Sequence, residues 1–328
     1  MTRKQKKYIK IGIGAIVIVF LLINIAIIIQ AYKLTHFSES AKPISVGYKP
    51  TISEMIKIAA CGLDIARPTT KQYPNCSYKS VYIHVDEGKQ LEAWLLHTDS
   101  LKRGIALVFH GYMDEKSSML DRAYALLDMG YDVLLVDFMG AGGSYGNQTT
   151  IGYLEGDNVK ASYDYVIKEL KEDKIIMMGF SMGAAAIMKA QHDYNMLTSA
   201  LILEAGYGTF KGTVSKRLDR LNIPHWPVSD LFTFWIGVIN GFNAFDANPQ
   251  EFGKEIHIPT LMMCGGKDPN IPKEETQLIF DQLASDKKEL VFFLDSPHET
   301  YLAKYSDKWK DVVSHFLQEM NSMDVYSE

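Results

Sequence analysis

Mainly apolar runs alternate with segments of helical periodicity through most of the chain. The runs predict strands at residues 105–109, 133–136, 175–178, 200–203, 260–263 and 290–294. Apolar residues at helical spacing predict helices near residues 119–129, 157–170, 184–192, 273–283 and 307–320. Strands that are apolar throughout are expected where helices cover both faces of a sheet. The alternation therefore predicts an α/β fold with a mostly parallel, doubly wound sheet.

Two further features interrupt or extend this pattern. Residues 81–85 and 91–96 read as strands on either side of a turn at residues 86–89, which predicts an antiparallel hairpin at one edge of the sheet. Residues 207–255 break the strand–helix rhythm and carry several aromatic side chains. We interpret them as a helical lid insertion over a site; the alternative is a peripheral packing element.

A long apolar run lies near the N-terminus. Residues 11–29 contain Asn24 as their one strongly polar member. At about 1.5 Å per residue, a helix of this run would span roughly 28 Å, close to the hydrocarbon thickness of a bilayer. We predict a transmembrane anchor at residues 11–30, since a cleaved signal has a shorter apolar core and a small-residue cleavage site that this run lacks.

Charge predicts the orientation of this anchor. Five Lys and Arg residues lie in the first ten positions, and the first acidic residue is Glu39. Because a basic flank stays on the cytoplasmic side, residues 1–10 are expected to be a cytoplasmic tail, with the rest of the chain beyond the anchor outside the cytoplasm. The chain beyond the anchor divides into a juxtamembrane segment at residues 31–79, with a short helix near residues 53–61, and a folded domain at residues 80–320.

Composition narrows the possible partners. The chain has 328 residues, 47 % of them hydrophobic, which is typical of a globular protein. Its formal net charge is -5, from 34 Lys and Arg against 39 Asp and Glu, and five of the basic residues belong to the N-terminal tail. The body is therefore acidic, which argues against nucleic acid as a partner because phosphate binding needs clustered cations.

Three cysteines occur in the chain. Cys264 lies inside an apolar run and is expected to be a buried thiol. Cys61 and Cys76 lie close together in a polar segment, where a disulfide is one outcome if the domain is extracytoplasmic. The spacing matches no zinc motif, and we predict neither a metal nor a cofactor.

The strongest chemical signal is the sequence GFSMG at residues 179–183. It follows a predicted strand and precedes an alanine-rich helix, which is the strand–turn–helix context of a nucleophile elbow. Flanking glycines let strand and helix approach closely, and the turn places the serine oxygen at a helix N-terminus, where backbone N–H groups favour negative charge. We predict that Ser181 is a nucleophile; the alternative is a glycine-rich turn with a capping serine.

Partners for this serine follow the last two predicted strands. Asp268 and His298 each lie in a loop just beyond a strand, at the edge where ligand sites of open α/β sheets occur. Ser181, Asp268 and His298 also follow the chain order expected for this fold. We predict that the imidazole accepts the serine proton and that the aspartate fixes its tautomer. Glu204 and Asp295 are the alternative acids.

The loop after residues 105–109 supplies the remaining candidates. Gly111 leaves the backbone free to turn toward the serine, so the N–H groups of Tyr112 and Met182 are predicted to form an oxyanion hole. His110 is expected to be structural rather than a catalytic base. The glycine-dense segment at residues 137–146 fits neither G-x-G-x-x-G nor a P-loop, and we interpret it as a structural turn at the floor of the site.

These residues resemble the α/β-hydrolase superfamily and, within it, the Bem46-like serine hydrolases, which combine one N-terminal hydrophobic segment with a compact hydrolase domain. The resemblance covers residues 80–317 and rests on His110-Gly111-Tyr112, on Asp137 with Gly142, Ser144 and Gly146, on GFSMG, on Gly266-Asp268-Pro269 and on His298-Glu299. Two departures alter the pocket wall: Phe138-Met139-Gly140 stands where Arg-Gly is common, and Tyr112 stands where asparagine is common.

The candidate residues and the resemblance predict a membrane-anchored serine hydrolase that cleaves carboxylic esters through an acyl-enzyme. The aromatic insertion and the anchor suggest a small-molecule or lipid-like acyl substrate. Thioester hydrolysis, acyl transfer and peptide cleavage by the same triad are the alternatives. A catalytically silent, membrane-anchored binding protein is the alternative from another class.

Overall fold

A single eight-stranded sheet organises the protein. The computed structural model describes residues 1–43, 50–220 and 222–324. The strand order is β1-β2-β4-β3-β5-β6-β7-β8. The strands are β1 (Tyr78–Asp86), β2 (Lys89–Leu96), β3 (Gly104–Phe109), β4 (Tyr131–Val136), β5 (Ile175–Phe180), β6 (Ala200–Glu204), β7 (Thr260–Gly265) and β8 (Lys288–Phe293). β2 pairs antiparallel with β1 and β4, whereas all pairs from β4 to β8 are parallel, which confirms the predicted sheet and its edge hairpin.

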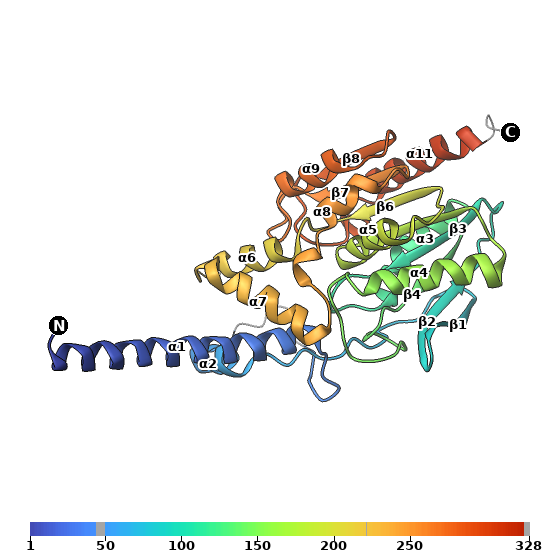
Figure 1. Cartoon of the computed structure of the whole chain (residues 1–328). Helices are drawn as coiled ribbons and strands as arrows, with labels where there is room; N and C mark the ends of the chain where they lie inside the picture. The colour runs from blue at the N-terminus through green and yellow to red at the C-terminus, as the bar shows by residue number, and fades with distance from the viewer. Residues whose placement is uncertain (44–49, 221, 325–328) are drawn as a thin grey trace.

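Helices cover both faces of the sheet (Figure 1). One face is packed by α3 (Leu120–Asp128) and α11 (Ser306–Asp324). The other is packed by α4 (Glu155–Tyr165), α5 (Met182–Tyr194) and α9 (Lys273–Gln282). Burial on both faces is why the central strands carry apolar residues at most positions rather than at alternate ones.

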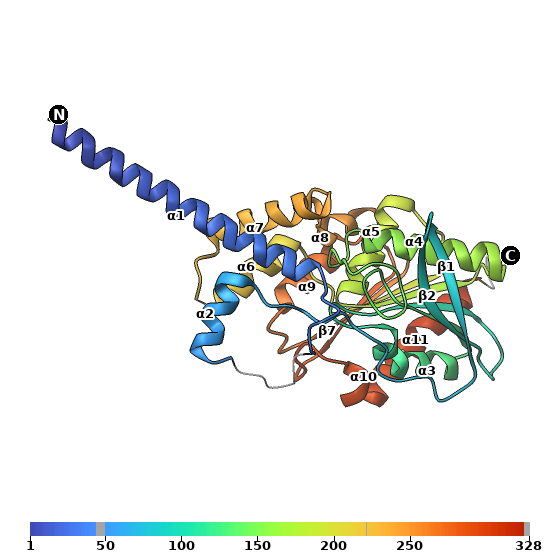
Figure 2. The same ribbon diagram turned by 90° about the horizontal axis from the view of Figure 1, so that it is seen from below.

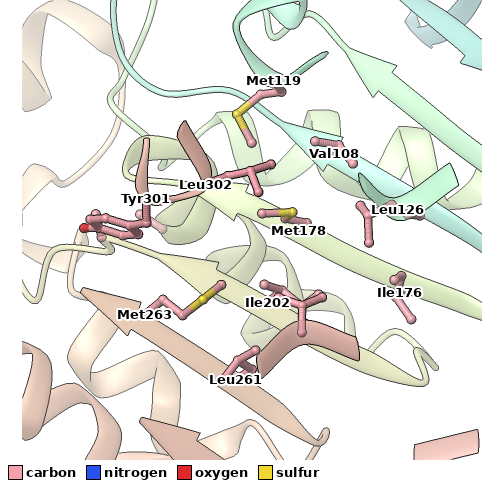
Figure 3. Packing of buried hydrophobic residues seen from close by; sticks show 14 of the residues in the cluster. Val108, Met119, Leu126, Ile176, Met178, Ile202, Leu261, Met263, Tyr301 and Leu302 are labelled. Atoms are coloured by element: carbon pink, nitrogen blue, oxygen red, sulfur yellow. The ribbon is translucent and has the colours of Figure 1, made fainter. Parts of the chain in front are cut away.

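The alternating directions of strand side chains divide the core into two clusters. On β5, Ile176 and Met178 belong to the cluster beneath α3 and α11, whereas Ile175 and Met177 belong to the cluster beneath α4 and α5. Figure 3 shows the first cluster, in which Met178 lies among side chains from neighbouring strands and from the segments over that face. The strand ends are therefore held rigidly, and with them the loops that follow.

Several element boundaries differ from the sequence prediction by a few residues, and two of the differences have a clear structural reason. The helix expected at residues 157–170 is α4 followed by a π-helical turn, η2 (Val166–Leu170). β8 begins two residues earlier than its apolar run, at Lys288 and Glu289. β8 is an edge strand whose residues are mostly half-buried, so polar residues are tolerated there and the apolar pattern underestimates its length.

The N-terminal helix α1 extends over Arg3–Thr35, beyond the predicted anchor at both ends. It is the one helix in the described parts of the chain that is long and apolar enough to cross a membrane, with a mean hydropathy of 3.0 over its most apolar 18 residues. Its N-terminal part projects away from the domain (Figure 1). Its C-terminal part is packed on the domain, where Ile27, Ala31 and Thr35 are buried.

The insertion at residues 207–255 is helical, as predicted. Its main helices are α6 (Phe210–Arg220) and α7 (His225–Asn240), followed by a short helix, α8 (Pro249–Phe252). The helix expected near residues 53–61 is α2 (Ile52–Cys61). In Figure 2, α2 and α7 lie beside the C-terminal half of α1, and α6 packs against α7. The N-terminal helix and the insertion thus form one group of helices at one end of the domain.

Candidate active site

Ser181 occupies a strained turn between β5 and α5. Its backbone has φ 53° and ψ -107°, a conformation that L-residues other than glycine rarely adopt and that clusters at functional sites. A Cβ on Gly179 would lie 2.4 Å from the carbonyl carbon of Gly183, and a Cβ on Gly183 would lie 2.5 Å from the carbonyl oxygen of Phe109. Both glycines of GFSMG are therefore needed for strand and helix to approach so closely.

His298 and Asp268 reach this serine from the ends of β8 and β7. The Nε2 atom of His298 lies 3.1 Å from the Oγ atom of Ser181. Its Nδ1 atom lies 2.6 Å from the Oδ2 atom of Asp268. Because a carboxylate can only accept a hydrogen bond, Nδ1 carries the proton and Nε2 presents its lone pair to the serine hydroxyl. The structure thus brings together the three residues that the sequence predicted.

Backbone hydrogen bonds hold Asp268 in place. Its side chain is fully buried, and its Oδ1 atom accepts the N–H groups of Asn270 at 2.7 Å and Ile271 at 3.0 Å. The imidazole of His298 also packs beside the ring of Phe180, with the centroids 5.1 Å apart. The carboxylate therefore cannot rotate away without losing two hydrogen bonds, and the orientation of His298 follows from it.

The two predicted oxyanion-hole residues flank the serine turn. Met182 is the first residue of α5, and Tyr112 follows β3 in the loop that begins His110-Gly111. In the described parts of the chain, neither backbone N–H has a protein acceptor. The phenol of Tyr112 donates to the carbonyl oxygen of Leu34, near the end of α1, at 2.7 Å. Burial raises the pKa of this phenol well above its usual value, so the group stays a donor that ties the loop to α1.

The two alternative acids, Glu204 and Asp295, are paired with residues other than His298. Glu204 is buried and accepts from the Nη2 atom of Arg122 at 2.6 Å and from the Nε1 atom of Trp309 at 2.5 Å. Asp295 is paired with Lys267 at 2.7 Å on the surface. The pairing of Glu204 with Arg122 could not be expected from the sequence, because Arg122 lies in an amphipathic helical pattern in which arginine is usually solvated.

Both ring nitrogens of His110 form hydrogen bonds with backbone groups. Its Nε2 atom accepts the N–H of Phe138 at 3.1 Å, so Nδ1 donates to the carbonyl oxygen of Gly111 at 2.8 Å. The neighbouring glycine-dense loop is organised by Asp137, whose carboxylate binds Lys116 at 2.5 Å and the N–H of Gly143 at 3.0 Å. These contacts fit the structural roles expected for His110 and for residues 137–146.

The insertion approaches the catalytic residues through α6. Burial lowers the pKa of Lys216, and the nearby charge of Asp268 opposes this shift. Lys216 is also ion-paired with Glu275, whose other carboxylate oxygen accepts the N–H of Gly208 at 2.7 Å. The base of α6 is thus fixed close to the triad acid.

All three cysteines are free thiols. Cys61 and Cys76 are exposed, and Cys264 is buried, as its apolar surroundings in the sequence predicted. Burial raises the pKa of Cys264 to about 11. The disulfide considered for the first two is not formed in this structure.

The strand order and the strained serine turn after the central strand define the chain as an α/β-hydrolase. The sequence model of the family described as "Serine aminopeptidase, S33" matches residues 101–225, which contain Ser181 but neither of its partners. Bem46 of Schizosaccharomyces pombe is 25 % identical over 261 residues, which cover 77 % of this chain and 80 % of that protein. YqkD of Bacillus subtilis is 23 % identical over 218 residues, covering 66 % and 71 %.

Solved structures show the same fold. The esterase Pf2001 of Pyrococcus furiosus has a TM-score of 0.64 and 23 % identity, covering 78 % of this chain and 99 % of its own. Est1E of Butyrivibrio proteoclasticus, solved with bound ferulic acid, has a TM-score of 0.57 and 19 % identity, covering 74 % and 99 %. Fold and relatives agree with the resemblance seen in the sequence: the chain has the α/β-hydrolase fold and is similar to Bem46.

Proposed function

We propose that this protein is a serine hydrolase that cleaves carboxylic esters through an acyl-enzyme, with Ser181 as nucleophile. The observation that carries the proposal is the continuous hydrogen-bond chain from Asp268 through His298 to a serine held at positive φ. A serine hydroxyl is a weak nucleophile at neutral pH, and a base within hydrogen-bond reach activates it.

In the first half of the reaction, the Oγ atom of Ser181 attacks the acyl carbonyl while Nε2 of His298 takes the hydroxyl proton. The carbonyl π electrons move to oxygen and form a tetrahedral oxyanion. Asp268 stabilises the resulting imidazolium without itself being protonated. The imidazolium then gives the proton to the alcohol oxygen as the ester C–O bond breaks, which leaves an acyl-serine.

The backbone N–H groups of Tyr112 and Met182 are the proposed donors to the oxyanion. The Met182 amide also lies at the N-terminus of α5, where the helix dipole favours negative charge. Loss of one such donor typically slows an acyl-transfer enzyme about 100- to 1000-fold. In the second half, His298 takes a proton from water as the water oxygen attacks the acyl-serine. The bond between the acyl carbon and Oγ of Ser181 then breaks, the imidazolium returns the proton to Oγ, and the carboxylic acid leaves.

Esters are the favoured substrate class because two of the fold's solved relatives are described as esterases or hold a phenolic acid. Peptide cleavage is the second candidate, because the matching family is described as serine aminopeptidases. The same residues would attack an amide, with an amine as the leaving group. Thioester hydrolysis and acyl transfer differ only in the leaving group or the acceptor.

We further propose that α1 anchors the protein in a membrane with its N-terminus in the cytoplasm. The length and hydropathy of α1 support a span, and the basic residues before Ile11 support this orientation. Protease added to the outside of sealed spheroplasts should then degrade the domain at residues 80–320 and spare a tag at Met1. Protection of the domain would contradict the orientation.

Substrate class is tested with the full chain in detergent. A p-nitrophenyl ester series of increasing acyl length and an aminoacyl p-nitroanilide are compared at equal active-site concentration. The proposal expects ester hydrolysis with an optimum acyl length and little anilide cleavage. Faster cleavage of the anilide than of every ester would favour the peptidase.

A further inference from the structure

The apolar part of α1 that is not covered by the domain is too short to cross a bilayer by itself. Through Ile23 every residue of α1 except Gly14 is exposed, whereas from Asn24 onward the helix is progressively covered by the domain. Residues 11–23 extend over about 20 Å at 1.5 Å per residue. A hydrocarbon core of roughly 30 Å needs about 20 residues. If α1 spans the membrane, the segment from Asn24 to about Gln30 must lie within its outer part.

That same segment is where two other helices are attached. The Nε1 atom of Trp235 on α7 donates to the Oδ1 atom of Asn24 at 3.1 Å. The Nε2 atom of Gln30 donates to the carbonyl oxygens of Ile58 and of Ala59 on α2, the latter at 3.3 Å. The two polar side chains of this part of α1 therefore satisfy hydrogen bonds through α7 and α2, as polar groups at membrane depth require.

The surface of α2 is unusual for a helix in water. Its sequence, ISEMIKIAAC, is mainly apolar, yet none of its residues is buried. Ile52 is 73 % exposed, Ile56 66 % and Met55 49 %. Helical stability in a soluble protein comes mainly from burying an apolar face, and this face has nothing from the described parts of the chain to bury against.

α7, which also packs beside the C-terminal half of α1, carries further exposed apolar side chains. Phe234 and Val238, one turn apart, are 49 % and 55 % exposed, and Trp226 at the start of the helix is 75 % exposed. Figure 2 shows α7 and α2 beside α1, which continues beyond both of them as the free part of the span. Large contiguous apolar surfaces mark protein or membrane contacts, and exposed tryptophan is typical of a membrane–water interface.

We propose that α2 and α7 are inserted in the interface of the leaflet next to the domain, where acyl chains and headgroups cover their apolar faces. Both helices contact the part of α1 that would lie at membrane depth, and this selects a bilayer over a second copy of the chain as the occupant. The proposal rests on the anchor described under "Proposed function" but not on the chemistry of Ser181. The hydrolase domain is then held against the membrane surface by three helices, α1, α2 and α7, rather than connected to it by α1 alone.

Quenching of tryptophan by lipids brominated on their acyl chains tests this arrangement. Single tryptophans are added to the full chain by Phe20→Trp, Phe234→Trp, Ile56→Trp or Leu197→Trp, and each variant is reconstituted in phosphatidylcholine vesicles with and without bromine. Phe20 lies in the free part of α1, and Leu197 is an exposed apolar residue between α5 and β6. Melting temperatures verify that each variant is folded, and the signal of the unsubstituted protein is subtracted.

The proposal expects brominated lipid to quench the tryptophans at 234 and 56 to an extent comparable with that at 20, and to leave the one at 197 unaffected. Quenching at 20 combined with none at 234 and 56 would overturn it. In that case, a signal at 234 that changes with the protein-to-lipid ratio would identify a second copy as the occupant. Absence of quenching at 20 would instead show that the anchor itself is wrong.

Discussion

Asp268→Asn is the substitution that separates the proposed acid from its rival most sharply. The side chain keeps its shape, and its oxygen is held by the N–H groups of Asn270 and Ile271. The new NH₂ group therefore faces Nδ1 of His298, where two donors would meet. The imidazole relieves this by moving its proton to Nε2, which then presents an N–H to Ser181 and cannot accept the serine proton.

The expected loss of kcat follows from the loss of His298 as a general base. In the serine-protease triad the equivalent change lowers kcat about 10⁴-fold, which corresponds to roughly 5.4 kcal/mol of activation free energy at about 1.36 kcal/mol per factor of ten. We expect a loss of the same order here. Stability should fall much less, because the two backbone hydrogen bonds to the side-chain oxygen are retained.

Glu204→Gln is the matched control. It also converts a buried carboxylate to an amide at a strand end, but it removes the charge that pairs with Arg122. Breaking a buried ion pair costs about 3–5 kcal/mol of folding stability, whereas the triad is untouched. Hydrolysis of a p-nitrophenyl ester per folded molecule and thermal unfolding are measured for both variants. A folded Glu204→Gln protein that loses 1000-fold in kcat, beside an Asp268→Asn protein within tenfold of the parent, would refute this assignment.

Three further outcomes are expected. A chain lacking residues 1–31 should be about 2–4 kcal/mol less stable than one lacking residues 1–23, because it loses the buried side chains of Ile27 and Ala31; equal melting temperatures would show that this packing contributes nothing. Gly183→Ala should destabilise the fold by about 1–3 kcal/mol or more, since its Cβ would meet the carbonyl oxygen of Phe109; unchanged unfolding and activity would contradict the packing at the elbow. Cys264 should resist maleimide at pH 7.5 until the protein is unfolded, because burial keeps its thiol protonated, whereas the other two cysteines react at once; its labelling in the native state would show that the site is open.

Much of the fold was predictable because the physics that produces it is local. Apolar runs and helical spacing located the strands, and a triad on consecutive loops could be read from strand ends, as for Asp268 and His298. The choice between Asp268 and Glu204 was not fixed by the sequence, since both follow buried strands. The proposal of Asp268 rests in part on the pairing of Glu204 with Arg122 and Trp309, which lie 82 and 105 residues away from Glu204.

The packing of α1 on the domain could likewise not be predicted from the sequence. An apolar run beside lysines predicts a membrane span, but not that the helix is packed on the domain along about a third of its length. Asn24 was visible only as a polar residue in an apolar run, and its partner Trp235 lies 211 residues further on. The phenol of Tyr112 and the carbonyl of Leu34 are separated by 78 residues. Such contacts depend on tertiary packing, which no local pattern records.

The central claim is that Ser181 is an activated nucleophile, and labelling of the full-length protein by a fluorophosphonate tests it most directly. The probe is applied to the parent and to Ser181→Ala, and the modified residue is located by mass spectrometry. We predict stoichiometric labelling of Ser181 in the parent and none in the variant. Equal labelling of both proteins, or no reaction of a well-folded parent, would contradict the account and favour a catalytically silent binding protein.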